Sequence, residues 1–577
     1  MKQLMTKWGK QVDKECVLQE YPRPLMVRDN FMNLNGSWNY LFADSAQKVK
    51  VDQGEIVVPF SPECVLSGVG RQLKPDEYLW YQRTFELNQN LINRHVILHF
   101  GAVDQGCQVF VNGKSMGRHT GGYLPFEMDI TRAVKAGENE IRVLVKDFSE
   151  TSYHARGKQR IERGGMFYTA QSGIWQTVWL EIVPCHYIET VICTPEFDEQ
   201  TVELTVAATE DLPFLVSVFE PVPGEAYASG ELIASTEGMS NQSCRIAIPK
   251  IKAWTPQEPY LYHMTIKMGD DQVESYFAMR TFTLEKDENQ IPRLCLNHVP
   301  YFQKGVLDQG YWPDGLYTAP SDEALVFDIQ SMKDMGFNMM RKHAKIECDR
   351  WYYHCDRLGM IVWQDMVNGG TQYKHWYVTY MATLLSKNKI KVKDTYTKLL
   401  SRKEKAGRLE FVVEMKETIR RLYSHPCIAT WVIFNEGWGQ FQTAEMTEIV
   451  RKLDPGRMID QASGWFDQGG GDMQSLHNYF FRFEMKAEKE RATVLSEFGG
   501  YSHAVAGHTA CEKTYGYGAE KTTDSLNATY QRRQKEVEDA ISQGLCATVY
   551  TQVSDVEEEI NGIFTYDREI QKIRGLK

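Results

Sequence analysis

The chain has 577 residues, too many for a single hydrophobic core, and its 42% hydrophobic and 24% charged residues are typical of a globular protein. Its net charge of −11 argues against nucleic acid as a partner, because such proteins concentrate positive charge. The 12 cysteines form no C-x-x-C pair, the N-terminal segment lacks the apolar core of a signal peptide, and no stretch approaches the ~20 apolar residues of a membrane span. We therefore expect a reduced, cytoplasmic protein that binds neither nucleic acid nor membrane.

Short runs of β-branched and aromatic residues, separated by turn residues, fill the chain from about residue 35 to 183. Asn112-Gly113 between two such runs supplies the positive φ angles that a tight hairpin needs. Strands at this spacing predict an all-β sandwich.

A second β series follows from about 184 to 283. About seven short strands in one hundred residues are typical of an immunoglobulin-like sandwich. We place its end at residue 284 and expect domains at 1–183, 184–284 and 285–577.

Strands and helices alternate after residue 285, and Ser321 is positioned to cap the first helix. Eight β segments with helical patterns between most of them predict a (β/α)₈ TIM barrel. These segments are 301–307, 338–343, 360–366, 427–436, 457–464, 474–480, 492–500 and 546–555.

An insertion at 374–408, after the third predicted barrel strand, carries ten Lys or Arg residues. A charge run of this kind is typical of a solvated helical insertion. Its position after a barrel strand also allows a binding rim on the active-site face.

Two predicted barrel strands end in a glutamate. The fourth passes from an apolar run into Asn435-Glu436, and the seventh ends in Glu497 before two glycines. Barrel enzymes place their chemistry at the carboxyl ends of the strands, so Glu436 and Glu497 can face each other across the barrel mouth.

A pair of carboxylates is what the hydrolysis of a glycosidic bond requires. One carboxyl group protonates the leaving oxygen, and the other attacks the anomeric carbon or activates water. A separation of about 5 Å predicts retention of configuration through a covalent intermediate, whereas a wider one predicts inversion.

Three barrel segments resemble the signatures of glycoside hydrolase family 2, namely 336–365, 424–439 and 494–501. Segments 34–42, 100–131 and 172–181 resemble the jelly-roll sugar-binding domain of that family. The resemblance covers nearly the whole chain and implies the order jelly roll, immunoglobulin-like sandwich, barrel, with a carbohydrate or glycoconjugate as substrate.

The resemblance also implies roles for individual residues. Glu436 corresponds to the family's general acid/base and Glu497 to its nucleophile, in a retaining reaction. Asn435 would bond the sugar 2-hydroxyl, Tyr479 would donate to the nucleophile, and Arg341 would supply a cation beneath it.

Further candidates for substrate binding lie at or near strand ends, and most have a structural alternative. The histidines can be hydrogen-bonded neighbours, the tryptophans can pack in the core or under loops, and Asp308 can turn its own loop. These candidates are His343, Asp365, Trp363, Asp308, Trp438, Trp465, His477 and Gln552.

Departures from the family pattern bear on metal and substrate. The Glu-x-His that holds magnesium in large β-galactosidases is missing from the stretch after the third strand, so we expect no metal and no cofactor. The chain also lacks the Asn-x-Lys-Gly with which β-glucuronidases hold the sugar carboxylate, and Gln552 stands where several relatives have Trp.

We expect an exo-acting enzyme that releases terminal β-galactosyl residues. The alternatives within the family are a β-glucuronidase, a β-mannosidase or an arabinosidase. An inactive carbohydrate-binding protein is the alternative from another class, and homo-oligomerisation is expected by analogy alone.

Overall fold

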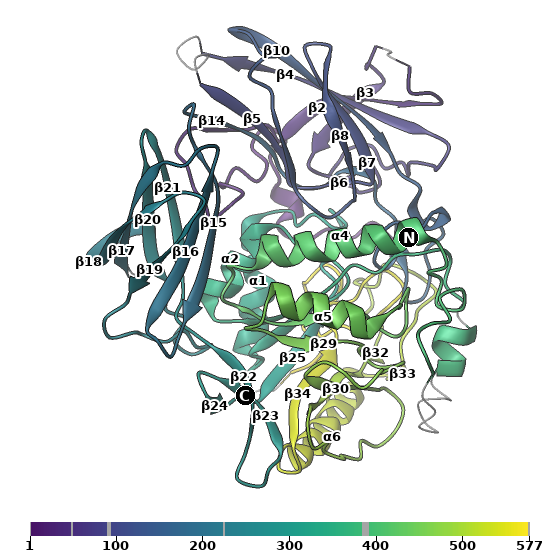
Figure 1. Cartoon of the computed structure of the whole chain (residues 1–577). Coiled ribbons are helices and arrows are strands. Elements are labelled where there is room, and N and C mark those ends of the chain that lie inside the picture. Colours follow the sequence, from purple (N-terminus) through teal and green to yellow (C-terminus); the bar gives the residue numbers. More distant parts are fainter. Residues whose placement is uncertain are drawn as a thin grey trace.

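The computed structural model describes residues 2–47, 50–88, 94–222, 225–374, 376–382 and 392–574. It contains two β-sandwiches and a barrel; Figure 1 shows the first sandwich above the barrel and the second at its side. The fold class predicted from the sequence is confirmed.

The first sandwich packs a four-stranded sheet, order β1-β14-β5-β9, on a six-stranded sheet, order β3-β2-β4-β10-β7-β8. Its predicted hairpin is confirmed: Asn112 and Gly113 have φ angles of 49° and 78° and join β7 to β8. The strands are β1 (Phe31–Asn33), β2 (Gly36–Ala43), β3 (Gly54–Val58), β4 (Tyr78–Leu87), β5 (His95–Phe100), β7 (Gly106–Val111), β8 (Lys114–Thr120), β9 (Phe126–Asp129), β10 (Gly137–Lys146) and β14 (Val178–Val183).

The second sandwich consists of a three-stranded sheet, order β15-β16-β19, and a four-stranded sheet, order β18-β17-β20-β21. Alternation of apolar and polar residues, clearest in β16, turns one face of each sheet into a shared core. The strands are β15 (Ile188–Glu196), β16 (Thr201–Ala208), β17 (Pro213–Val222), β18 (Glu225–Met239), β19 (Ser243–Ala247), β20 (Tyr262–Met268) and β21 (Asp271–Phe277).

A small sheet leads from the second sandwich into the barrel. Its first strand, β22 (Phe282–Lys286), pairs with β23 (Pro292–Leu296), which in turn pairs with β24 (Val299–Pro300). The domain boundary expected after residue 284 therefore falls inside β22.

The barrel is an eight-stranded parallel sheet in the order β29-β28-β27-β26-β25-β34-β31-β30. Its two end strands meet where the Asp472 amide donates to the Ile459 carbonyl at 2.9 Å, so the barrel is nearly closed. All eight predicted strands are present: β25 (Gln303–Asp308), β26 (Met339–Lys342), β27 (Ile361–Asp365), β28 (Ile428–Val432), β29 (Met458–Asp460), β30 (Met473–Asn478), β31 (Ala492–Gly499) and β34 (Leu545–Thr551).

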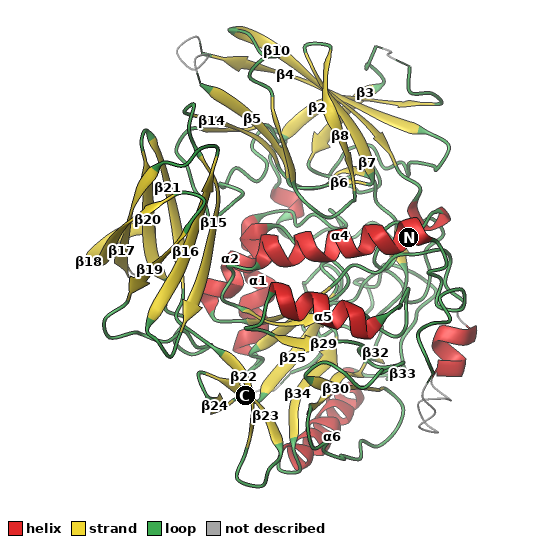
Figure 2. Cartoon of the chain, in the orientation of Figure 1, coloured by secondary structure: helices red, strands yellow, loops and turns green. Residues whose placement is uncertain are grey.

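Helices connect most of the barrel strands (Figure 2). The first begins as predicted, because the Ser321 hydroxyl accepts from the Ala324 amide at 3.3 Å. The α-helices are α1 (Asp322–Asp334), α2 (Asp349–Leu358), α4 (Lys405–Leu422), α5 (Thr443–Leu453) and α6 (Thr523–Ile541). Among the described residues, no helix is both long and apolar enough to cross a membrane.

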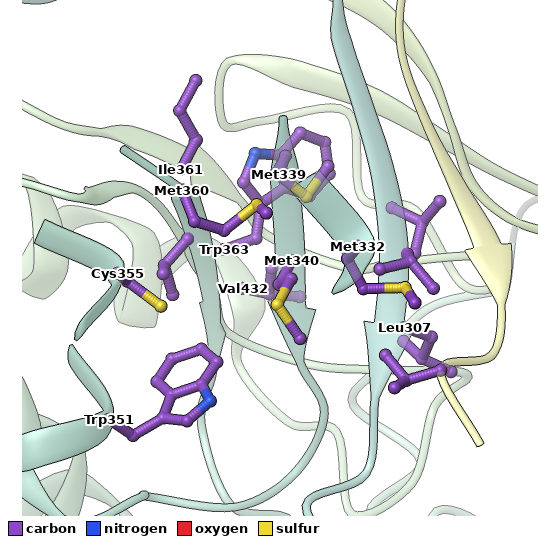
Figure 3. Close-up of a cluster of buried hydrophobic side chains, with 14 of the residues drawn as sticks. Leu307, Met332, Met339, Met340, Trp351, Cys355, Met360, Ile361, Trp363 and Val432 are labelled. Carbon is purple, nitrogen blue, oxygen red and sulfur yellow. The ribbon is translucent and has the colours of Figure 1, made fainter. Parts of the chain in front are cut away.

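Alternation along β26 separates two environments, to which the neighbouring Met339 and Met340, labelled in Figure 3, belong. Met340 and Lys342 face outward, where the Lys342 ammonium lies 4.0 Å from the ring of Trp351 on α2. Met339 and Arg341 face the barrel interior. The same alternation decides which side chains of the neighbouring strands reach the barrel mouth.

The described part of the 374–408 insertion is partly packed and partly solvated. It forms a short helix, Trp376–Met381, turns and the start of α4; Tyr377 and Leu400 are buried in a cluster with Trp438. The described lysines Lys393, Lys398 and Lys403 are exposed, as expected for a solvated insertion, while residues 375 and 383–391 lie outside the described ranges.

Candidate active site

The two predicted glutamates meet at the carboxyl end of the barrel. Glu436 follows β28, and Glu497 lies in β31 opposite His477 of β30. One carboxylate oxygen of each glutamate and one ring nitrogen of His477 all lie within 4.8 Å of one another.

Glu497 is held at both oxygens. The guanidinium of Arg341 donates to Oε1 at 3.3 Å, and the Tyr479 hydroxyl donates to Oε2. Burial would raise the pKa of Glu497, but the electrostatic effects of His477 and Arg341 outweigh burial and lower it to about 2. Glu497 is therefore a buried carboxylate that stays ionised.

Arg341 is fully buried and joins several strand ends. It forms two 2.9 Å hydrogen bonds to the carboxylate of Asp365 and a third of 2.9 Å to the Asn435 Oδ1. A further bond of 2.9 Å reaches the Ser463 hydroxyl beyond β29. The planar guanidinium fixes these acceptors relative to Glu497.

The bond from Arg341 also orients the amide of Asn435. Because Oδ1 accepts from the guanidinium, Nδ2 must point the other way, and that nitrogen is buried with no acceptor in the described protein. An unmet buried donor beside two carboxylates can serve a ligand hydroxyl.

Glu436 leaves its strand through a strained turn. Its φ is +50°, and its amide donates to the Ser463 carbonyl at 2.9 Å. Gly437 follows with φ of +73°, and a Cβ there would lie 2.4 Å from the Phe466 ring. The glycine after the glutamate is therefore required by both conformation and space.

His477 joins the two carboxylates. Its Nδ1 is 2.9 Å from Glu436 Oε1, and its Nε2 is 3.0 Å from the Ser463 hydroxyl and 3.6 Å from Glu497 Oε1. The three residues have a spacing that could hold a metal ion, but both oxygens of Glu497 already have protein donors. The hydrogen-bonded role expected for His477 agrees with this geometry.

Two other predicted residues support Arg341 rather than the cavity itself. His343 Nδ1 is 2.6 Å from the Asp365 Oδ2, so Asp365 is held from two sides. Burial lowers the pKa of His343 despite the opposing charge of Asp365, which favours a neutral ring. His343 therefore acts as a hydrogen-bonded neighbour of Asp365, which is the structural alternative given for it above.

The two predicted stacking tryptophans differ in exposure. Trp438 is 2% exposed, stacks on Tyr373 with ring centres 5.9 Å apart, and lies 5.7 Å from Phe167. Trp465 is half-buried and lies edge-on to His477 at 5.4 Å. Stacking of a sugar on either ring remains a prediction.

Two predicted substrate contacts are wrong. Asp308 pairs with Lys342 in the strand register, and both side chains face outward. The Asp308 carboxylate accepts hydrogen bonds from the Lys342 ammonium at 2.6 Å and from the Gly310 amide at 2.8 Å. Trp363 does face inward, but it is fully buried in the core and donates to Gln303 at 2.6 Å.

Gln552 lies just beyond β34 and is fully buried. Its amide donates to Asn561 at 2.8 Å, and Asn561 donates to Glu559 at 3.0 Å. The side chain therefore belongs to a network of the last barrel loop, and a sugar contact remains a prediction.

Sequence reasoning missed three residues near the glutamates. Tyr517 stacks on Tyr479 with ring centres 3.7 Å apart, and the exposed Phe480 lies edge-on to Tyr517 at 5.8 Å. Lys158 reaches the same region from the first sandwich, and its charge helps to lower the pKa of Glu497 after the effects named above. Only the basic run at 156–163 could have pointed to Lys158.

Models of one family match three successive parts of the chain. Residues 71–184 match the sugar-binding domain of glycosyl hydrolases family 2, residues 186–280 match a further glycosyl hydrolases family 2 model, and residues 317–572 match the family's TIM barrel domain.

Similar proteins include both β-galactosidases and β-glucuronidases. A β-galactosidase of Thermoanaerobacter pseudethanolicus is 22% identical over 560 residues, which is 92% of this chain and 68% of that protein. A β-glucuronidase of Streptococcus agalactiae is 22% identical over 75% of this chain and 72% of its own length. A β-galactosidase of Leuconostoc mesenteroides is 26% identical to this chain. The match covers 66% of this chain but only 35% of that protein.

Solved structures share the fold. A β-glucuronidase from an uncultured Clostridium species superposes with a TM-score of 0.73 at 18% identity, covering 94% of this chain and 96% of that one. The β-glucuronidase of Ruminococcus gnavus in complex with D-glucuronic acid gives 0.69 at 18% identity, covering 96% and 98%. With the three family models in order along the sequence, the chain is a glycoside hydrolase of family 2.

Proposed function

We propose that this protein is a retaining, exo-acting β-glycoside hydrolase in which Glu497 is the nucleophile and Glu436 the acid/base. The spacing of the two carboxylates carries the proposal, because oxygens within 4.8 Å suit direct attack on the sugar. An inverting enzyme would need about 6.5–9.5 Å between its carboxyl groups to admit a water.

The reaction has two steps. Glu497 forms a bond to the anomeric carbon while the bond to the leaving oxygen breaks and Glu436 donates its proton to that oxygen. Glu436, now ionised, takes a proton from water, and the hydroxide attacks the same carbon and releases Glu497. Two inversions give net retention.

The neighbours of the two glutamates support these roles. Arg341 and Tyr479 favour the ionised form of Glu497 that attack requires. The unmet Asn435 Nδ2 supports a bond to the sugar 2-hydroxyl, which strengthens as charge develops in the transition state.

The terminal sugar is the less determined part of the proposal. β-Galactoside is the first expectation from the sequence, and β-galactosidases are among the similar proteins. β-Glucuronide is the second candidate, because a β-glucuronidase is among them too. A β-mannoside or an arabinoside has no comparable support here.

An inactive carbohydrate-binding protein fits the site less well. The strained turn at Glu436 and the unmet buried amide donor of Asn435 cost free energy, and binding alone does not require two donors that keep Glu497 ionised. A cytoplasmic location and a homo-oligomeric state remain predictions.

A panel of 4-nitrophenyl β-glycosides tests the proposal. Wild-type protein should release nitrophenol from at least one member, Glu497→Gln should not, and Glu490→Gln, which changes an exposed glutamate just before β31, should behave as wild type. Proton NMR of the first product should show the β-anomer. No turnover across the panel, or an α-anomer, would overturn the assignment.

A further inference from the structure

Four lysines are buried in the described part of the chain, and one of them differs from the others. Three have a carboxylate partner, whereas Lys158 has none. The paired lysines are Lys342 with Asp308, Lys345 with Glu347 and Lys572 with Asp555, at N–O distances of 2.6, 2.6 and 2.5 Å.

Lys158 as a residue is 7% exposed, yet its ammonium has neither a hydrogen-bond acceptor nor a carboxylate within 4 Å among the described residues. Its described contacts are with two ring faces, Tyr168 at 5.6 Å and Trp438 at 5.8 Å. An ammonium on a buried residue that has no protein counter-charge is suited to an anionic ligand.

The backbone around Lys158 is fixed against the barrel. The amides of Arg156 and Gly157 both donate to the Asn368 carbonyl at 3.0 Å, beyond β27. Gly157 has φ of +60°, and a Cβ there would lie 2.5 Å from the Ala344 carbonyl oxygen, beyond β26. The first sandwich therefore delivers Lys158 to the barrel mouth on a closely packed loop.

The ammonium faces the candidate active site. Trp438, over which it lies, is two residues from Glu436. Burial, which raises the pKa of Glu497, is opposed chiefly by His477 and Arg341, and Lys158 adds to that lowering. Both oxygens of Glu497 already have donors, so serving the nucleophile does not account for Lys158.

We propose that Lys158 is a specificity-determining residue that binds an anionic group, a carboxylate or a sulfate, on the terminal sugar. The proposal rests on the hydrolysis proposed above and adds that the first sandwich completes the sugar site. It replaces the neutral galactoside expected from the sequence with an acidic sugar, although the barrel lacks the Asn-x-Lys-Gly motif.

The kinetic test compares three substrates: 4-nitrophenyl β-D-glucuronide, the 6-sulfate of 4-nitrophenyl β-D-galactoside, and the unmodified galactoside. Lys158→Met should lower kcat/KM on the preferred acidic substrate by about 10- to 100-fold, the range for a lost hydrogen bond to a charged group. The unmodified galactoside should change less than about threefold. The two acidic substrates distinguish carboxylate from sulfate.

Two variants control this comparison. Lys158→Arg keeps the charge and should retain more activity on the acidic substrate than Lys158→Met. Lys146→Met removes a lysine from β10 of the same sandwich, where its ammonium bonds the Glu77 carbonyl at 3.0 Å, and should change neither activity. Equal losses on acidic and neutral substrates in Lys158→Met would show an effect on Glu497 and overturn the proposal.

Calorimetry with free sugars separates this proposal from the hydrolytic one. Wild type should bind glucuronate or galactose 6-sulfate more tightly than glucose or galactose, and Lys158→Met should lose that preference. This result without turnover of any glycoside would support Lys158 while refuting the hydrolase. Binding of neutral sugars alone, or a preference kept in Lys158→Met, would overturn the role of Lys158.

Discussion

The two candidate catalytic glutamates have different surroundings. Glu497 is almost fully buried and is held at both oxygens by Arg341 and Tyr479. Glu436 is more exposed, with 13% of its side chain accessible, and its carboxylate has one described partner, His477. The difference matches the two proposed roles: a nucleophile must stay ionised and still, whereas an acid/base must exchange a proton in each half-reaction.

The largest loss of activity is expected from substitution of Glu497. Glu497→Gln removes the attacking carboxylate and should lower kcat by about 10⁴-fold or more, measured on the best substrate of the panel. An added small anion such as azide should not restore turnover with retention of configuration, because retention requires the covalent intermediate on Glu497. Residual activity above about 1% of wild type would contradict the role of Glu497.

Glu436→Gln should have a smaller effect and lower kcat/KM by about 10²- to 10⁴-fold. The decrease should be smallest for substrates whose leaving group needs no proton. The substitution should also remove the alkaline limb of the pH–rate profile, because that limb reports loss of the proton that Glu436 donates. An alkaline limb that is unchanged in the variant would show that another group is the acid.

Tyr479→Phe tests how the surroundings of Glu497 keep it ionised. Its hydroxyl donates to the ionised form of Glu497, so removing it should raise the pKa of Glu497 from about 2 and move the acid limb of kcat/KM to higher pH by about one unit. Activity near neutral pH, where Glu497 remains ionised, should fall by about 10-fold or less. Tyr515→Phe serves as a control in the neighbouring loop.

His477→Asn should have the smallest effect. The imidazole positions Glu436 through one hydrogen bond and lies 3.6 Å from Glu497 Oε1, so kcat should fall by about 3- to 10-fold with KM little changed. Because a merely structural role would leave the pH profile unchanged, a shift of either limb is the informative readout. His263→Asn, in the second sandwich, is the matched control.

The barrel mouth was largely predictable from the sequence. Apolar runs that end in Glu436 and Glu497 identify two strand ends, and the rule that barrel chemistry lies at these ends brings them together. Arg341 and Tyr479 followed from the family resemblance, and the structure places both on Glu497.

The errors and omissions have physical reasons. Asp308 ends a strand, but alternation turns it outward beside Lys342, so a strand-end position alone does not place a side chain in the mouth. Trp363 points inward but lies in the packed barrel interior. Lys158 comes from another domain, and contacts between domains depend on packing that no local pattern records.

Trapping of the covalent intermediate tests the central claim most directly. Protein incubated with the 2-deoxy-2-fluoro β-glycosyl fluoride of its preferred sugar should gain the mass of one glycosyl group, and peptide mapping should place it on Glu497. Glu490→Gln should be labelled at the same site. A label on Glu436, or turnover with inversion and no label, would contradict the double-displacement account.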